Sequence, residues 1–390
     1  MQQAAEEEKG KAQKGPWALV VLGTAGVTTF LAMPVIAAAL VNELGVDERG
    51  VGLFSTIQLI TLSVGCLVST FLPQQHGRRY GLAALGIMIV CDGLCLLQPD
   101  WSSFLFLRGL GGAAGGVAVS QATAAMSRTE NPERSFGLFL ALQTLVAVLC
   151  VYTMPALIAA HGFYAGYVVL LAFATLAFLA LRASRMMPEF DGAVSLLRGN
   201  SRIDWLRCGS LLASILCFFI GVGVLWTFLA LLGQGIGLTA SEIALTLSIS
   251  KLIAFAASFL PGLIGTRYGR LGPILASVAI LVGATQVYGI SQGFVAFVVA
   301  TALFSLGWYV IYPFQLGALG QVDRDGRPML AAAALTGAGL GIGPALAALG
   351  PRGPAGIYLI ATLAFLAAGL FAVAGLLRLP QPAPALAKGL

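Results

Sequence analysis

The sequence predicts an all-α integral membrane protein with twelve transmembrane helices, arranged as two six-helix bundles in a parallel pseudo-twofold repeat. Charged residues make up 10% of the 390 residues and hydrophobic residues 58%, against about 25% and 45–50% in soluble domains. Apolar runs of about 20 residues, the length that a helix needs to cross a bilayer, recur from Trp17 to Leu377. A short basic loop signature also occurs twice, around Gly77 and around Gly269.

The polar breaks divide the apolar sequence into two sets of six expected helices. The first set covers residues 17–41, 51–72, 81–98, 103–126, 136–160 and 166–181. The second set covers residues 207–232, 242–264, 272–290, 294–318, 330–349 and 357–377. The expected domains are an N-terminal tail at 1–16, a bundle at 17–181, a linker at 182–206, a second bundle at 207–377 and a C-terminal tail at 378–390.

Lysine and arginine are distributed unevenly between the two sides of the expected membrane. With a cytoplasmic N-terminus, all the loop and tail Lys and Arg residues except Arg49 and Arg352 lie inside. The positive-inside rule therefore places both termini in the cytoplasm of a multi-pass inner-membrane protein. The net charge of +6 is then a topology signal and indicates no nucleic-acid partner.

The two halves correspond when the chain is shifted against itself. The shift superimposes Gly77 on Gly269 and Pro155 on Pro344, and the two prolines are expected to kink matching helices. Two halves in the same orientation are related by an axis along the membrane normal. A cytoplasmic linker between such halves permits rocking around a site near the membrane midplane.

The repeated basic loop follows the second expected helix of each half. Its residues are Gly77, Arg78 and Arg79 in the first copy, and Gly262, Arg267, Gly269 and Arg270 in the second. These arginines lie at cytoplasmic helix ends, where a guanidinium can reach lipid phosphates or the last carbonyls of a neighbouring helix. Topology anchoring and gating are both consistent with this position.

The loop resembles the signature of the major facilitator superfamily, Gly-x-x-x-Asp-Arg-x-Gly-Arg-Arg. Gln74 and Thr266 stand where that family has its acid. Arg108, followed by Gly112 and Gly116, matches a second family element, and in proton-coupled members an arginine at this position is associated with proton transfer. The resemblance covers essentially the whole chain and implies the twelve-helix fold of that family and secondary transport by alternating access, with the substrate subfamily unassigned.

Three ionisable residues fall inside expected helices: Asp92, Arg108 and Lys251. A charge at the centre of a membrane helix costs about 2.5–3.5 kcal/mol, so it is kept near water, a partner or a substrate. Asp92 and Arg108 lie at the same depth on antiparallel neighbours, which allows them to pair. The pair is either a static ion pair or a proton acceptor, Asp92, whose charge Arg108 modulates.

Lys251 has no evident partner in the sequence. Glu242 precedes it by nine residues and lies out of phase on the same helix. With Arg108 in one half and Lys251 in the other, a cavity between the halves is expected to be electropositive and to favour an anionic substrate. The further candidate residues for substrate binding are Gln58, Gln143, Tyr152, Trp226, Trp308, Tyr312 and Gln315.

The expected function is secondary active transport of a small organic anion by alternating access, with proton coupling left open. The alternatives are a multidrug/H+ antiporter that depends on Asp92 and Arg108, and a transport-inactive membrane sensor with the same fold. An enzyme is not expected, because no nucleophile motif, His/Asp pair or metal-ligand set occurs. The expected partners are a small-molecule substrate, the lipid bilayer and, where coupling occurs, protons. No cofactor or metal is expected, and the protein is expected to be monomeric.

Overall fold

A computed structural model describes residues 17–72, 76–126, 132–184, 205–265, 267, 269–290, 293–322 and 327–377. The expected tails at 1–16 and 378–390, and residues 185–204 of the expected linker, lie outside these described residues.

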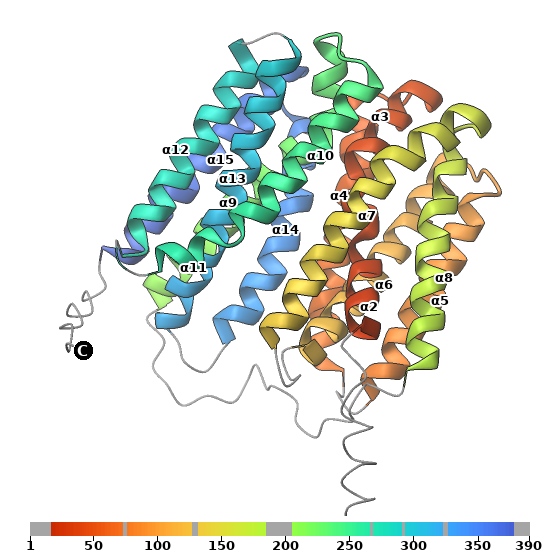
Figure 1. Ribbon diagram of the computed structural model, residues 1–390, viewed down its shortest axis with the longest axis horizontal. Coiled ribbons are helices and arrows are strands. Elements are labelled where there is room, and N and C mark those ends of the chain that lie inside the picture. The colour runs from red at the N-terminus through yellow and green to blue at the C-terminus, as the bar shows by residue number, and fades with distance from the viewer. Residues whose placement is uncertain are drawn as a thin grey trace, which may run out of the picture.

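The N-terminal half forms one helical bundle, which stands on the right in Figure 1. Its helices are α2 (Trp17–Leu31), α3 (Met33–Leu44), α4 (Glu48–Phe71), α5 (Gly77–Cys95), α6 (Trp101–Met126), α7 (Pro132–His161) and α8 (Tyr167–Ala183). A short 3-10 helix, η2 (Phe163–Gly166), leads into α8. Helix α6 packs against α2, α4 and α5.

The C-terminal half forms a second bundle, which stands on the left in Figure 1. Its helices are α9 (Trp205–Gly235), α10 (Ala240–Ala257), α11 (Leu260–Ile264), α12 (Leu271–Ile290), α13 (Phe294–Val322), α14 (Arg327–Leu349) and α15 (Pro354–Leu376). Helix α9 packs against both α14 and α15.

The helices confirm the expected twelve membrane spans. In the part of the chain that the structure describes, ten helical segments are long and apolar enough to cross a membrane, and a shorter apolar segment runs from Ala334 to Leu349. Helix α5, with 19 residues, supplies the remaining span. The break expected near residues 99–101 is also present, because Asp100 precedes α6 and its carboxylate accepts hydrogen bonds from the backbone N–H groups of Ser102 and Ser103. Hydrogen bonds from Ser103 hold the pKa of Asp100 below its usual value.

Two expected helices are interrupted in the structure, each just before a proline. The first span divides at Ala32 into α2 and α3, with Pro34 in the first turn of α3. The eighth span divides at Ser258 and Phe259 into α10 and α11, with Pro261 in the first turn of α11. Proline has no backbone N–H and its ring clashes with the preceding turn, so it breaks the hydrogen-bond ladder at these points.

The two bundles meet along α4 and α14 on one side and along α7 and α10 on the other. Two hydroxyl groups of α4 donate to carbonyl oxygens of α14: Thr56 Oγ1 to Gly341 at 2.9 Å and Ser63 Oγ to Ala334 at 2.6 Å. A Cβ at Gly341 would lie 3.0 Å from the backbone nitrogen of Ile60. Small residues thus let the two backbones approach closely, as is usual between helices in lipid.

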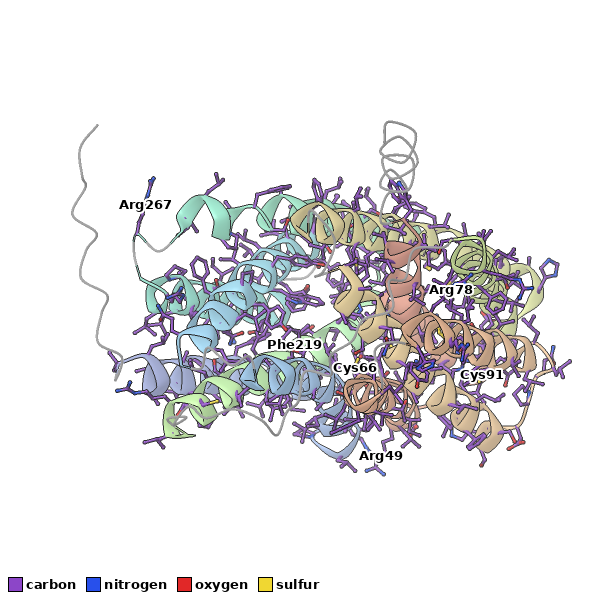
Figure 2. All side chains as sticks on the ribbon, turned by 90° about the horizontal axis from the view of Figure 1, so that it is seen from below. Arg49, Cys66, Arg78, Cys91, Phe219 and Arg267 are labelled. Carbon is purple, nitrogen blue, oxygen red and sulfur yellow. The ribbon has the colours of Figure 1, made fainter. Side chains whose placement is uncertain are left out.

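Following the orientation expected from Lys and Arg, we call the face that carries residues 45–47 and 350–353 the outer face. It lies at the top of Figure 1. The opposite face, from which Figure 2 is viewed, is called the inner face.

Candidate functional site

Lys251 lies on α10 with its ammonium against two tryptophan rings. Its Nζ is 3.9 Å from the centroid of the Trp226 ring and 5.7 Å from that of Trp308. Only 6% of the residue is exposed. The start of α10 is fixed by a capping box, in which the Thr239 hydroxyl accepts from the Glu242 N–H and the Glu242 carboxylate accepts from the Thr239 N–H. This cap satisfies two of the backbone N–H groups that the first turn of α10 leaves without helical partners.

The rings beside Lys251 belong to an aromatic cluster of Phe30 on α2, Trp226 on α9 and Trp308 on α13. Their centroids are 6.2 Å apart for Phe30 and Trp226, 6.3 Å for Phe30 and Trp308, and 6.1 Å for the two tryptophans. The cluster therefore contains one residue of the N-terminal bundle and two of the C-terminal bundle. It lies at the boundary between them.

A hydrogen bond joins the two bundles at this boundary. The indole Nε1–H of Trp226 donates to the backbone carbonyl of Phe30 over 2.9 Å. In an unbroken helix that carbonyl would accept from the residue four positions later, which is Pro34 and has no N–H. The proline that interrupts the first span thus leaves free the acceptor that the other bundle uses.

The charge of Lys251 is only partly compensated. In the described residues it has no carboxylate partner, and its recorded contacts are with the two rings. A desolvated cation–π contact contributes about 2 kcal/mol, whereas removing an ammonium from water costs several kcal/mol. The site therefore attracts a negative charge.

Small cavities lie beside Lys251 and are lined by residues of both bundles. One of them, here called the inner recess, is lined by Leu31, Leu140, Gln143 and Thr144 of the N-terminal bundle and by Lys251, Phe255, Ser258 and Tyr309 of the C-terminal bundle. A second, the middle cavity, is lined by Lys251 and Trp226 together with Leu31, Ala147, Val148, Val151, Leu247 and Ser248. A third cavity opens toward the outer face. Lys251 lines the first two cavities, and residues of both bundles form the walls of each.

Asp92 and Arg108 form an ion pair. Arg108 Nη2 lies 2.9 Å from Asp92 Oδ1, and the two side chains are 1% and 5% exposed. The Arg108 guanidinium also lies 4.8 Å from the centroid of the Tyr167 ring on α8. The pair is therefore enclosed by α5, α6 and α8 within the N-terminal bundle.

Arg108 lies apart from Lys251. It lines none of the three cavities described above, and its expected contact with substrate stays a prediction. The physical reason for its position is the pairing itself, because the guanidinium turns toward Asp92 and Tyr167 and away from the second bundle. Of Arg108 and Lys251, only Lys251 places its positive charge near the boundary between the bundles.

Of the seven further candidates, three lie beside Lys251. Gln143 lines the inner recess, Trp226 lines the middle cavity and Trp308 belongs to the aromatic cluster. Tyr312 lies one turn after Trp308 on α13, and its hydroxyl is 3.2 Å from that of Thr336 on α14.

The other three candidates line none of the three cavities described above, and their role in substrate binding stays a prediction. Gln58 is buried within its own bundle, where its Nε2 is 3.1 Å from the position of a Cβ at Gly112. Gln315 donates to Ser214 Oγ at 2.9 Å inside the C-terminal bundle. Tyr152 is 52% exposed and lines none of the three cavities.

Sequence reasoning missed Phe30 and Tyr309. Tyr309 follows Trp308 directly and lines the inner recess. Phe30 supplies both a ring and a backbone acceptor to the boundary. The available signal for Phe30 was Pro34, four residues later, because a proline at that spacing frees a carbonyl for a partner.

The first copy of the basic loop joins two helices of one bundle. Gly77 begins α5, and Arg78 Nη2 donates to the carbonyl of Arg182 at the end of α8 over 2.7 Å. This contact confirms the expectation that the arginine reaches the last carbonyls of a neighbouring helix. Arg79 is exposed beside it.

The second copy of the loop lies at the inner end of the other bundle. Arg267 is exposed, and Figure 2 shows it at the edge of the C-terminal bundle, far from Arg78. Gly269 has a φ of +67°, a conformation that favours glycine. Arg270 Nε lies 3.0 Å from the position of a Cβ at Gly317 on α13. Gln74 and Thr266, which replace the family's acid, lie outside the described residues.

Both repeat-related prolines lie inside helices, Pro155 in α7 and Pro344 in α14. Pro155 lines the cavity that opens toward the outer face. The carbonyl of Pro344 lies 2.7 Å from the position of a Cβ at Gly52 on α4. Both prolines thus lie at the boundary between the bundles, and matching kinks stay a prediction.

Comparison with known proteins agrees with the fold and the family resemblance. No curated protein matches the chain. A structure of a proton-dependent oligopeptide transporter, studied for substrate recognition, shares 14% identity over 93% of this chain and 97% of its own, with a TM-score of 0.72. An auto-inhibited peptide transporter of the POT family shares 13% identity over 95% and 98%, with a TM-score of 0.72.

A third structure, the POT family transporter PepTSo, shares 13% identity over 92% of this chain and 97% of its own, with a TM-score of 0.70. At such identities the three structures show a shared fold and nothing about a shared substrate. The family model described as Major Facilitator Superfamily matches residues 18–324. The chain therefore belongs to the Major Facilitator Superfamily and is a multi-pass membrane transporter, of the secondary type, and not an enzyme.

Proposed function

We propose that the protein transports a small organic anion, whose negative group binds the ammonium of Lys251 between the two bundles. The observation that carries the proposal is the partly compensated charge of Lys251, which is buried against Trp226 and Trp308 without a carboxylate in the described residues. A substrate carboxylate would supply the missing counter-charge. When the substrate leaves, the Lys251 ammonium would again contact only the Trp226 and Trp308 rings.

The location of Lys251 supports alternating access. A substrate site must be reachable from each side in turn, so it belongs at the boundary between the rocking bundles. Lys251 shares its cavities with Leu31, Gln143 and Val151 of the other bundle. The proposed orientation places both termini in the cytoplasm and the protein in the inner membrane, on the distribution of Lys and Arg.

Peptides are the second candidate substrate, because the three similar structures are POT family or peptide transporters. A peptide carries a carboxylate that suits Lys251. It also carries an ammonium group that needs an acidic partner. Asp92 is already paired with Arg108, and the cavity-lining carboxylate, Glu43, lines the third cavity, which Lys251 does not line. This arrangement favours an anion without a cationic group.

Proton coupling is part of the proposal, but Asp92 is not assigned as the proton carrier. Its enclosure with Arg108 supports a structural ion pair. The multidrug/H+ antiporter alternative requires Asp92 to exchange protons with a cavity, and neither residue lines one of the three cavities described above.

The test is counterflow in proteoliposomes with radiolabelled monocarboxylates, a dipeptide and a lipophilic cation, each with and without a pH gradient. We expect saturable counterflow of a monocarboxylate that Lys251→Ala abolishes and Lys251→Arg partly retains. Leu252→Ala is the matched control, because Leu252 follows Lys251 on α10 and is 67% exposed.

Unchanged carboxylate counterflow in Lys251→Ala would overturn the proposed binding residue. Counterflow of the dipeptide alone would favour the peptide reading, and counterflow of the lipophilic cation would favour the antiporter. Failure of all three substrates, in protein that binds a carboxylate, would favour the transport-inactive sensor.

A further inference from the structure

The cavity that opens toward the outer face has a volume of about 140 Å³. We call it the outer chamber. Its lining residues come from α3, α7, α9 and α10, and they include Ala38, Glu43, Val151, Gln234, Ala244 and Leu247. Both bundles therefore form its walls.

The chamber is apolar along its length and polar at its mouth. Its polar side chains are Asn42, Glu43 and Gln234, which lie near the outer ends of α3 and α9. The rest of the lining is aliphatic, and alanines such as Ala38 and Ala244 leave the space that larger side chains would fill. A polar ligand body would lose its hydrogen bonds to water there without replacement.

The chamber ends beside the middle cavity, a void too small for a water molecule that Lys251 also lines. Val151 on α7 and Leu247 on α10 line both spaces, so a ligand that joins them needs only these two side chains and Lys251 to move. Leu247 precedes Lys251 by four residues, one turn of α10. A ligand whose negative group meets Lys251 therefore has its remaining atoms directed toward the chamber.

We infer that the outer chamber binds the apolar, ring-sized body of the anionic substrate, which makes the substrate class aryl and branched-alkyl monocarboxylates. The inference rests on the proposed function, because it takes the Lys251 ammonium as the partner of the carboxylate. The size supports it, since an apolar cavity of about 150 Å³ accommodates a benzene molecule. The apolar wall disfavours a peptide body, whose backbone N–H and C=O groups would be left unpaired.

Acetate and phenylacetate separate the two parts of the site, because both carry a carboxylate and only the second carries a ring. Burying a phenyl-sized group is expected to tighten binding by about 10- to 100-fold. Equilibrium binding of the two radiolabelled acids to the purified full-length protein measures this ratio. Neither acid binding to the unmodified protein would overturn the assigned substrate class.

Ala244→Phe fills the chamber from α10, where Ala244 is 7% exposed. We expect it to weaken phenylacetate binding by about 10-fold or more and to leave acetate binding unchanged. Leu245→Phe is the matched control, because Leu245 is the next residue and is 45% exposed on the other face of the helix. It is expected to leave both affinities unchanged.

Ala38→Leu narrows the chamber from the opposite bundle and gives the same test if Ala244→Phe does not fold. Unchanged phenylacetate binding in both chamber variants, or equal losses for the two acids, would overturn the inference. Lys251→Ala tests the proposed function separately. It is expected to abolish binding of both acids, and binding of both at wild-type affinity would refute the lysine site whatever the chamber variants do.

Discussion

The ammonium Nζ of Lys251 lies 3.9 Å from the centroid of the Trp226 ring. The same indole donates its N–H to the carbonyl of Phe30 in the other bundle. One tryptophan thus contacts the charge that we propose binds substrate and also closes the boundary between the bundles. A ligand that draws Lys251 away from the ring changes the surroundings of an inter-bundle hydrogen bond.

Trp226→Phe is expected to destabilise the closed boundary. The variant keeps an aromatic ring but removes the indole N–H, and Pro34 gives the Phe30 carbonyl no replacement donor. An unsatisfied buried acceptor costs about 1–3 kcal/mol. Thermal unfolding in one detergent measures the loss. Trp308→Phe is the control, because no hydrogen bond of the Trp308 indole is recorded in the described residues, and equal losses in the two variants would contradict the role of the N–H.

Pro34→Ala is expected to make the Trp226 hydrogen bond less important. Alanine restores an N–H four residues after Phe30, so the carbonyl regains a donor within its own helix. In the Pro34→Ala background, Trp226→Phe should therefore cost less than it costs in the native protein. A double-mutant cycle of unfolding free energies gives the coupling. Additive costs would show that Pro34 does not free the acceptor.

The positions of the spans were predictable from the sequence, because length and hydropathy alone define a membrane helix. The Asp92–Arg108 pair was also predictable, since two buried charges at one depth on neighbouring helices have few other partners. The breaks at Ala32 and at Ser258 are each followed by a proline, which is visible in the sequence. The continuous hydropathy of each run nevertheless predicts one unbroken helix.

The directions of polar side chains were not predictable in the same way. In water a helix shows which face is buried by its amphipathic pattern. Here both faces of α4 and α13 are apolar, so nothing in the pattern distinguished a glutamine that faces its own bundle from one that faces a cavity. The sequence therefore places Gln58 and Gln315 among the candidates for the substrate site, whereas in the structure they lie against Gly112 and Ser214.

Replacing one partner of the Asp92–Arg108 pair is expected to be strongly destabilising. Asp92→Asn leaves a buried guanidinium without its counter-charge, at a cost of about 3–5 kcal/mol, and Arg108→Met leaves a buried carboxylate at a similar cost. The double variant should cost less than the sum of the two, because it leaves no unpaired charge. Chemical unfolding of the single and double variants measures the coupling.

The same variants test the proton-carrier reading of Asp92. A structural pair predicts that the double variant, when folded, keeps the dependence of transport on the pH gradient. Loss of that dependence with unchanged stability would instead assign Asp92 as the proton acceptor.

Glu48→Ala is expected to open the outer face more often. The Glu48 carboxylate, at the start of α4, accepts a 3.0 Å hydrogen bond from the N–H of Gly353, just before α15 in the other bundle. A hydrogen bond to a charged group contributes about 1.5–3 kcal/mol, so its loss should shift the equilibrium toward the open state by about 10- to 150-fold.

Labelling of an Ala147→Cys variant by a membrane-impermeant maleimide reports this opening, because Ala147 lines the middle cavity and is only 1% exposed in this closed structure. Arg49→Ala is the control, since Arg49 is the adjacent residue and is exposed. Similar labelling rates in the two backgrounds would show that Glu48 does not hold the outer face closed.

Gly116→Ala is expected to separate α6 from α4. A Cβ at Gly116 would collide with the carbonyl oxygen of Leu62 and would lie 2.7 Å from the backbone nitrogen of Cys66. Backbone atoms cannot move aside like the end of a side chain, so the helices must shift, at a cost of about 1–3 kcal/mol. Gly86→Ala on α5 is the control, because a Cβ there meets nothing within 4 Å and alanine favours the helix by about 1 kcal/mol. The two variants should therefore change the unfolding free energy in opposite directions, and a stabilising effect of Gly116→Ala would show that α4 and α6 are not in backbone contact at this position.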